Sequence, residues 1–165
     1  MNRKITKYTL EKATEHLSYE ISLFYQTLVF LTQPRPQIEV NILLDSFAIH
    51  TRNLFDFFYP KKNTKPDDML VSDFIGKSSY FSRNKTKKKD LIFVVRKADK
   101  QVAHLTYARN RYNQNTKRWP FVAIGIKMIK TLNAFYKALP NSYKNWTDFK
   151  ELKKVNDSLQ NSFNA

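Results

Sequence analysis

One predicted helix, residues 37–59, carries ionisable side chains in the middle of an otherwise apolar pattern. His50 and Asn53 are spaced i, i+3 and Arg52 and Asp56 are spaced i, i+4, so each pair shares a face. An imidazole can move a proton and a guanidinium can stabilise negative charge on a phosphate, so His50 and Arg52 are candidate catalytic residues. Alternatively, Arg52 and Asp56 form a partly buried ion pair, and His50 is a core histidine within a structural polar network that includes Asn53.

A second predicted helix, residues 90–111, carries His104 on a polar flank beside its apolar stripe. Cations at helical spacing share this flank and would favour the neutral imidazole. A neutral imidazole beside cations is the arrangement needed for general-base attack on a phosphodiester, which makes His104 the main catalytic candidate. The flank and the basic segment before the helix supply the candidate nucleic-acid contacts: Lys97, Lys100, Tyr107, Arg109, Arg111, Arg83, Lys85, Lys87, Lys88 and Lys89.

Four long segments position these groups, and in each of them apolar residues recur at steps of three and four. They span residues 10–31, 37–59, 90–111 and 118–139, and prolines follow the first, second and fourth. Apolar residues in the tail after Trp146 predict one further short helix. The sequence therefore predicts an all-α fold, an antiparallel up-down four-helix bundle with a short C-terminal fifth helix.

Residues 61–89 are expected to form a long connection between the second and third helices, with one short helical piece at residues 72–75. The connection ends in the basic run Arg83–Lys89, which has no apolar period and is expected to be mobile and solvated. The length of the chain suits a single domain over residues 1–165.

The formal net charge of +15 is the largest anomaly in the composition. A field of this size attracts RNA or another polyanion, although a basic surface can also serve solubility alone. The sequence has only 2 Gly, and this low number argues against dinucleotide-binding and P-loop folds. The absence of Cys removes thiol chemistry and fits a reducing cytoplasm.

We expect no metal, no cofactor and no integral membrane association. The 3 His residues do not have the spacing of a metalloprotease pair, and the carboxylates lack a Glu-x-x-His arrangement. No apolar run approaches the roughly 18 residues that a membrane span requires.

The segment Val102-Ala103-His104-Leu105, on a helix rich in cations, resembles the signature region of the HEPN superfamily of helical-bundle proteins. That superfamily includes metal-independent ribonucleases of toxin and phage-defence systems. The resemblance implies that His104 acts on the RNA phosphate and 2′-hydroxyl together with a preceding Arg, commonly across a homodimer interface. Arg96 lies one residue too far upstream of His104 to match the spacing of the superfamily. Either Arg96 or Lys97 therefore takes the role of the Arg, or the site is inactive.

The leading functional hypothesis is an RNA-binding helical protein that acts as a metal-independent endoribonuclease. In it, His104 is the base and Arg52 or Arg96 stabilises the phosphorane. The alternative is a non-catalytic interaction module for a protein partner or nucleic acid, in which the His-Arg-Asp set of residues 50–56 is purely structural.

Overall fold

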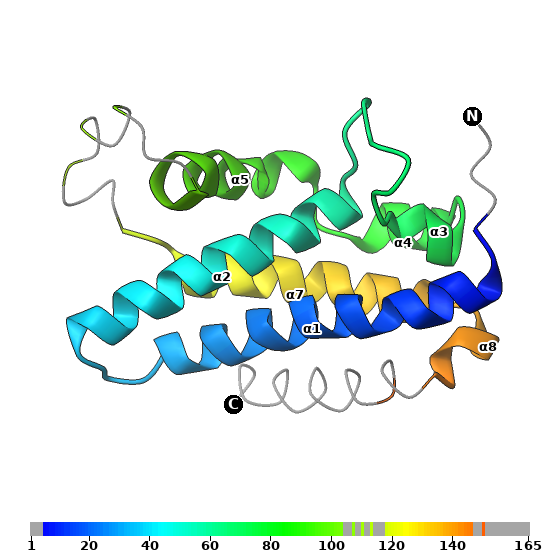
Figure 1. Cartoon of the computed structure of the whole chain (residues 1–165), viewed down its shortest axis with the longest axis horizontal. Coiled ribbons are helices and arrows are strands. Elements are labelled where there is room, and N and C mark those ends of the chain that lie inside the picture. Colours follow the sequence, from blue (N-terminus) through cyan, green and yellow to red (C-terminus); the bar gives the residue numbers. More distant parts are fainter. Residues whose placement is uncertain are drawn as a thin grey trace.

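The computed structural model describes residues 5–103, 107, 110, 113, 118–146 and 150. Within these ranges the secondary structure is helical and contains no strand (Figure 1), which confirms the predicted all-α class. The long helices are α1 (Lys7–Leu31), α2 (Gln37–Phe58) and α7 (Phe121–Ala138). The shorter elements are α3 (Val71–Ile75), α4 (Ser79–Asn84), the 3-10 turn η1 (Lys88–Asp90), α5 (Ile92–Ala98), the π-helical turn η2 (Asp99–Ala103) and α8 (Asn141–Lys144).

Local sequence signals set the ends of the first two helices. The Thr6 hydroxyl caps α1 by accepting a hydrogen bond from the Thr9 backbone N–H at 3.1 Å. Pro36 is the residue immediately before α2, where its fixed φ suits a helix start. The two helices then pack against each other, and α5 contacts α2, so that Figure 1 shows α2 between α1 and α5.

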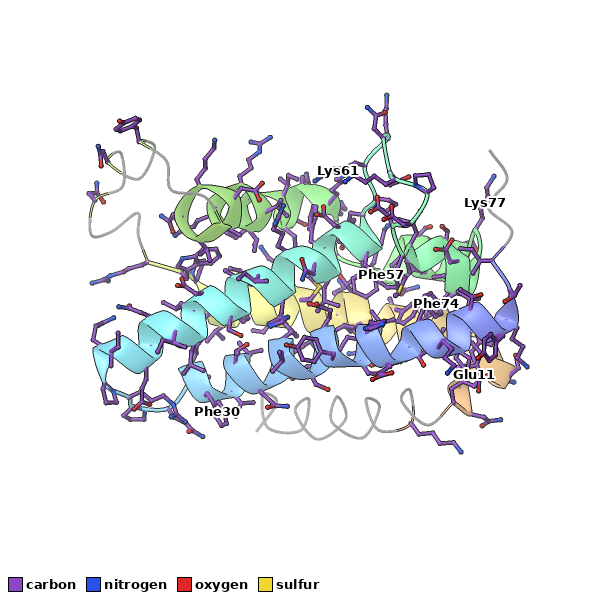
Figure 2. The ribbon with its side chains drawn as sticks, in the orientation of Figure 1. Glu11, Phe30, Phe57, Lys61, Phe74 and Lys77 are labelled. Atoms are coloured by element: carbon purple, nitrogen blue, oxygen red, sulfur yellow. The ribbon has the colours of Figure 1, made fainter. Side chains whose placement is uncertain are left out.

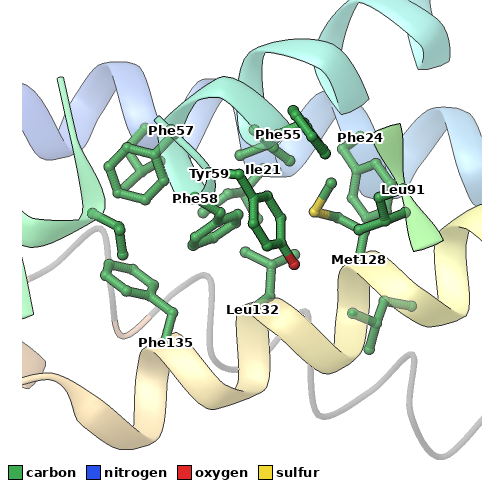
Figure 3. Packing of buried hydrophobic residues seen from close by; sticks show 14 of the residues in the cluster. Ile21, Phe24, Phe55, Phe57, Phe58, Tyr59, Leu91, Met128, Leu132 and Phe135 are labelled. Atoms are coloured by element: carbon green, nitrogen blue, oxygen red, sulfur yellow. The ribbon is translucent and has the colours of Figure 1, made fainter. Parts of the chain in front are cut away.

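An aromatic cluster joins the end of α2 to α3 and α7 (Figure 3). The Phe135 ring is fully buried, and its centroid lies 5.6 Å from that of Phe57 and 5.7 Å from that of Phe58. Phe74 of α3 adds a third ring at 6.1 Å. Edge-on ring contacts of this kind add to the stabilisation from buried apolar area. The cluster therefore holds the C-terminal end of α2 and helix α3 against α7.

The connection over residues 61–89 is more ordered than the sequence predicts. It contains the helical piece expected at residues 72–75, which is α3, and in addition the helix α4. Thr86, in the middle of the basic run, is buried. The Tyr59 hydroxyl donates to the Thr86 carbonyl at 2.6 Å, and the Thr86 hydroxyl donates to the Lys127 carbonyl at 2.7 Å. The expectation of a mobile, solvated run is therefore wrong at Thr86, because these hydrogen bonds attach the run to α2 and α7.

Burial raises the pKa of Tyr59 above its ordinary value, and Asp90 raises it further, while the Thr131 hydroxyl, 3.2 Å away, lowers it. The folded protein therefore favours the neutral phenol, and this contribution to stability is full below the ordinary Tyr pKa and falls as the pH rises through the folded value.

We expect the stability difference between the parent protein and Tyr59→Phe to shrink between about pH 8 and about pH 11. Urea unfolding at both pH values measures this difference. A difference that stays constant would show that the phenol does not titrate with folding.

The predicted third helix is interrupted. Regular α-helix ends at Ala98 and the π-helical turn η2 follows, whereas the sequence pattern predicts one helix over residues 90–111. Most of the remainder of that helix, with His104, lies outside the described residues, as does most of the predicted fifth helix. The last continuous described range ends with Trp146, which is buried and stacks on Tyr143 at 4.3 Å.

Candidate functional site

His50 is held on the α1 side of α2. Its Nδ1 lies 2.8 Å from Glu20 Oε2, and Asn53 Nδ2 donates to the same oxygen at 3.1 Å. The Tyr19 ring meets the imidazole edge-on at 5.7 Å, and only 8 % of His50 is exposed. His50 is thus a hydrogen-bonded, buried histidine. Glu20 is the partner that sequence reasoning missed, because no local spacing links α1 to α2.

Arg52 faces a different helix. Its Nε lies 2.8 Å from Asp99 Oδ1, at the start of the π-helical turn η2. The expected i, i+4 pairing of Arg52 with Asp56 is corrected, since Asp56 Oδ1 instead lies 3.5 Å from Lys61 Nζ. His50 and Arg52 therefore do not converge: one side chain contacts α1 and the other contacts η2.

A groove of about 550 Å³ lies beside this polar set, between α1, α2 and the loop of residues 61–70. Its polar residues include His16, Glu20, Arg52, Asn53, Asp56 and Lys61. Figure 2 shows Lys61 at the loop side and Phe57 on the helix below it. The groove was not predicted from the sequence, because its α1 wall lies more than thirty residues away in the chain from its other two walls.

The cations of the basic run Arg83–Lys89 differ in their exposure to solvent. Arg83, Lys87, Lys88 and Lys89 are exposed, whereas Lys85 is half-buried with its ammonium 4.7 Å above the Tyr59 ring. Burial, and then the neighbouring Lys88, lower the pKa of Lys85. The Lys88 ammonium also donates to the backbone carbonyl of Tyr59 at 3.3 Å, which brings the run to the end of α2.

Helix α5 and the following turn η2 carry three of the predicted cations. Arg96 is exposed on α5, as is Lys100 in η2, while Lys97 donates to the Arg118 carbonyl and lies 5.0 Å from the Trp119 ring centroid. Burial lowers the pKa of Lys97. Its ammonium is already engaged by the Arg118 carbonyl and the Trp119 ring.

The rest of the predicted site is incompletely described. Tyr107 is 91 % exposed. His104, Arg109 and Arg111 lie outside the described residues. Within the described ranges there is no group of three or more His, Cys, Asp or Glu side chains that could hold a metal ion. None of the described helices combines the length and apolar character needed to cross a membrane.

Removing the Arg52 guanidinium is expected to destabilise the fold. Both partners of the Arg52–Asp99 pair are about one-third exposed, which places the pair between surface and buried ion pairs. We expect Arg52→Ala to lower the free energy of unfolding by about 1–2 kcal/mol, since it leaves the Asp99 carboxylate without its cation.

A double-mutant cycle with Asp99→Ala, followed by urea unfolding, measures the coupling of this pair. The local i, i+4 pair Arg35–Glu39, in which the side chains are 25 % and 47 % exposed, is the control, for which the coupling should stay below about 0.5 kcal/mol. Additive effects of Arg52→Ala and Asp99→Ala would show that the pair is not coupled.

Comparisons of the chain with protein-family models, with curated proteins and with solved structures found no match.

Proposed function

We propose that this protein binds RNA in single-stranded form through one basic surface. We define the basic surface as the exposed cations of residues 61–100, namely Lys61, Lys62, Lys65, Lys77, Arg83, Lys87, Lys88, Lys89, Arg96 and Lys100. The observation that carries the proposal is the segregation of charge over the fold.

The charge is distributed unequally between the helices. Residues 61–100 carry twelve Lys and Arg against five Asp, whereas α1 and α2 together carry three cations against six carboxylates. In Figure 1, α5 and the loop after α2 lie on the side of α2 away from α1. A polyanion is therefore drawn to the surface of residues 61–100 and is repelled by the α1 side.

Exposed aromatic rings in the same part of the chain favour unpaired bases. Tyr80 and Phe93 are each 38 % exposed, and Tyr107 is more exposed still. Bases without a pairing partner stack on such rings, which a duplex does not permit. The hydrogen bonds of Thr86 to α2 and α7 support the proposal further, because they hold the basic run in place. Less conformational entropy is then lost when RNA binds.

RNA cleavage at His104 is a further part of the proposal. The π-helical turn that leads to it supports this step, since π-helical turns occur frequently at functional sites. Arg96, exposed in the last turn of α5, is the cation that we assign to the phosphorane. His50 and Arg52, held by Glu20 and Asp99, are assigned a structural role instead. His104→Ala should abolish cleavage of a labelled RNA, and unchanged cleavage would exclude this residue as the base.

We include three finer expectations in the proposal. The long helices belong to an antiparallel up-down four-helix bundle, two copies of the chain form a homodimer, and the protein acts in the cytoplasm. The absence of Cys fits that compartment.

A protein-binding module is the second candidate function. It is favoured by Ile38, Ile42 and Ile49, which follow one another along one face of α2 and are 66 %, 63 % and 41 % exposed. These side chains lie on the first two-thirds of α2, outside the basic surface, so a protein partner and RNA can be tested separately.

The experiment that tests RNA binding is a fluorescence-anisotropy titration of a 5′-labelled uridine 20-mer. We expect the affinity to fall by at least about tenfold between about 50 and about 300 mM salt, since bound Lys and Arg displace counterions from the phosphates. Equal affinity at both salt concentrations would contradict electrostatic binding.

A further inference from the structure

The groove between α1, α2 and residues 61–70 has the dimensions of a site for one nucleotide unit. Its volume of about 550 Å³ falls within the range of small-molecule sites in proteins, roughly 300–1,000 Å³. Apolar side chains contribute to its lining, among them Leu17, Leu54, Phe57 and Met69. These surfaces suit the face of a flat ring.

The charges of the groove are balanced, unlike those of the basic surface beside it. Arg52, Lys61 and Lys65 contribute three cations to its lining, and Glu20, Asp56 and Asp68 contribute three carboxylates. Because its charges cancel, the lining taken together does not favour an anionic ligand. It suits an uncharged group that offers hydrogen-bond donors, while an attached phosphate stays at the rim.

Glu20 is oriented to accept such donors. Its Oε2 already accepts from Asn53 and lies 2.8 Å from His50 Nδ1, which fixes the carboxylate in place. The described part of the chain supplies no hydrogen bond to its other oxygen, Oε1, although Glu20 lines the groove. A fixed carboxylate with an available oxygen accepts well from an exocyclic amino group of a nucleobase.

We propose that this groove binds one unpaired nucleobase that carries an exocyclic amino group, adenine, cytosine or guanine, from the bound RNA strand. Glu20 accepts from the amino group, and the flanking phosphates contact Lys61 and Lys65 at the rim, next to Lys62 of the same loop (Figure 2 shows the position of Lys61). Uracil, which has no amino group, binds less well. The inference rests on the proposed RNA binding and adds to it a subsite with base preference.

The test compares a uridine 10-mer with 10-mers in which one central residue is adenosine, cytidine or guanosine. We expect at least one substituted RNA to bind about tenfold more tightly than the uridine 10-mer, the usual scale of a base contact. Asn53→Trp fills the groove from an exposed position, and Glu20→Gln removes the charged acceptor; either should reduce the preference to about one. Asn41→Trp, at an exposed position of α2 outside the groove, is the matched control that should keep the preference.

The possible outcomes separate the two proposals. Salt-dependent RNA binding without any base preference, or a preference that both groove variants retain, overturns the groove subsite and leaves the proposed function in place. Absence of RNA binding to the parent protein overturns the proposed function and the subsite with it. Circular dichroism of both groove variants checks their folding, and the milder Glu20→Gln decides the question if Asn53→Trp is unfolded.

Discussion

Replacing Phe135 with Ala is expected to lower the free energy of unfolding by about 3–5 kcal/mol. The ring is fully buried and packs against Phe57, Phe58 and Phe74, so its removal loses apolar burial and leaves a cavity between α2, α3 and α7. A domain of ordinary stability, about 5–15 kcal/mol, would lose a large part of its margin.

Urea denaturation followed by circular dichroism measures this loss. Phe93→Ala is the control, because Phe93 is 38 % exposed and its removal leaves no enclosed cavity; its cost should stay near about 1 kcal/mol. Equal midpoints for Phe135→Ala and Phe93→Ala would contradict the assignment of Phe135 to the centre of the core.

The second large effect is expected on RNA affinity. The triple variant Lys62→Ala, Lys87→Ala and Lys89→Ala removes three exposed cations of the basic surface. If all three contact phosphates, the slope of log affinity against log salt should become less steep by about 2, and affinity at low salt should fall by about tenfold or more. Anisotropy titrations over a salt series give both quantities.

A charge-matched control separates the location of the cations from their number. Lys7, Lys130 and Lys137 are also exposed but lie on α1 and α7, outside the basic surface. Their triple replacement by Ala lowers the net charge equally, and it should leave the slope within about 0.5 of the parent value. Equal losses in the two triple variants would show that total charge, and not the basic surface, determines binding.

The helices whose ends depend on local chemistry were predictable from the sequence. Prolines separate α1 from α2 and follow the end of α7, because proline restricts the backbone whatever it packs against. The apolar positions of α1 that recur at steps of three and four are buried, from Leu10 to Leu31. Local spacing is sufficient for such features.

The candidate site was less predictable, because its contacts join distant segments. Helical spacing suggested that Arg52 pairs with Asp56, but the structure places Asp99 beside Arg52. In the same way Glu20 is the partner of His50, and no pattern in the sequence links α1 to that position. Pairing between distant residues follows from the packing of the helices, and local spacing in the sequence does not reveal that packing.

The basic run shows the same limit. A stretch of five cations in seven residues indicates a solvated segment, and a single Thr among charged residues gives no sign of burial. Thr86 is nevertheless buried, because Tyr59 and Lys127 supply hydrogen-bonding partners from α2 and α7. The anchoring of the run was visible only once these helices were placed.

The most direct measurement of the central proposal is photo-crosslinking of the protein to 4-thiouridine-labelled single-stranded RNA, followed by mass spectrometry of the crosslinked peptides. The proposal predicts that the crosslinks fall in residues 61–100, on the basic surface and its exposed aromatic rings, and that they weaken as salt is raised. Crosslinks confined to α1, or a complete absence of crosslinks at low salt, would contradict it.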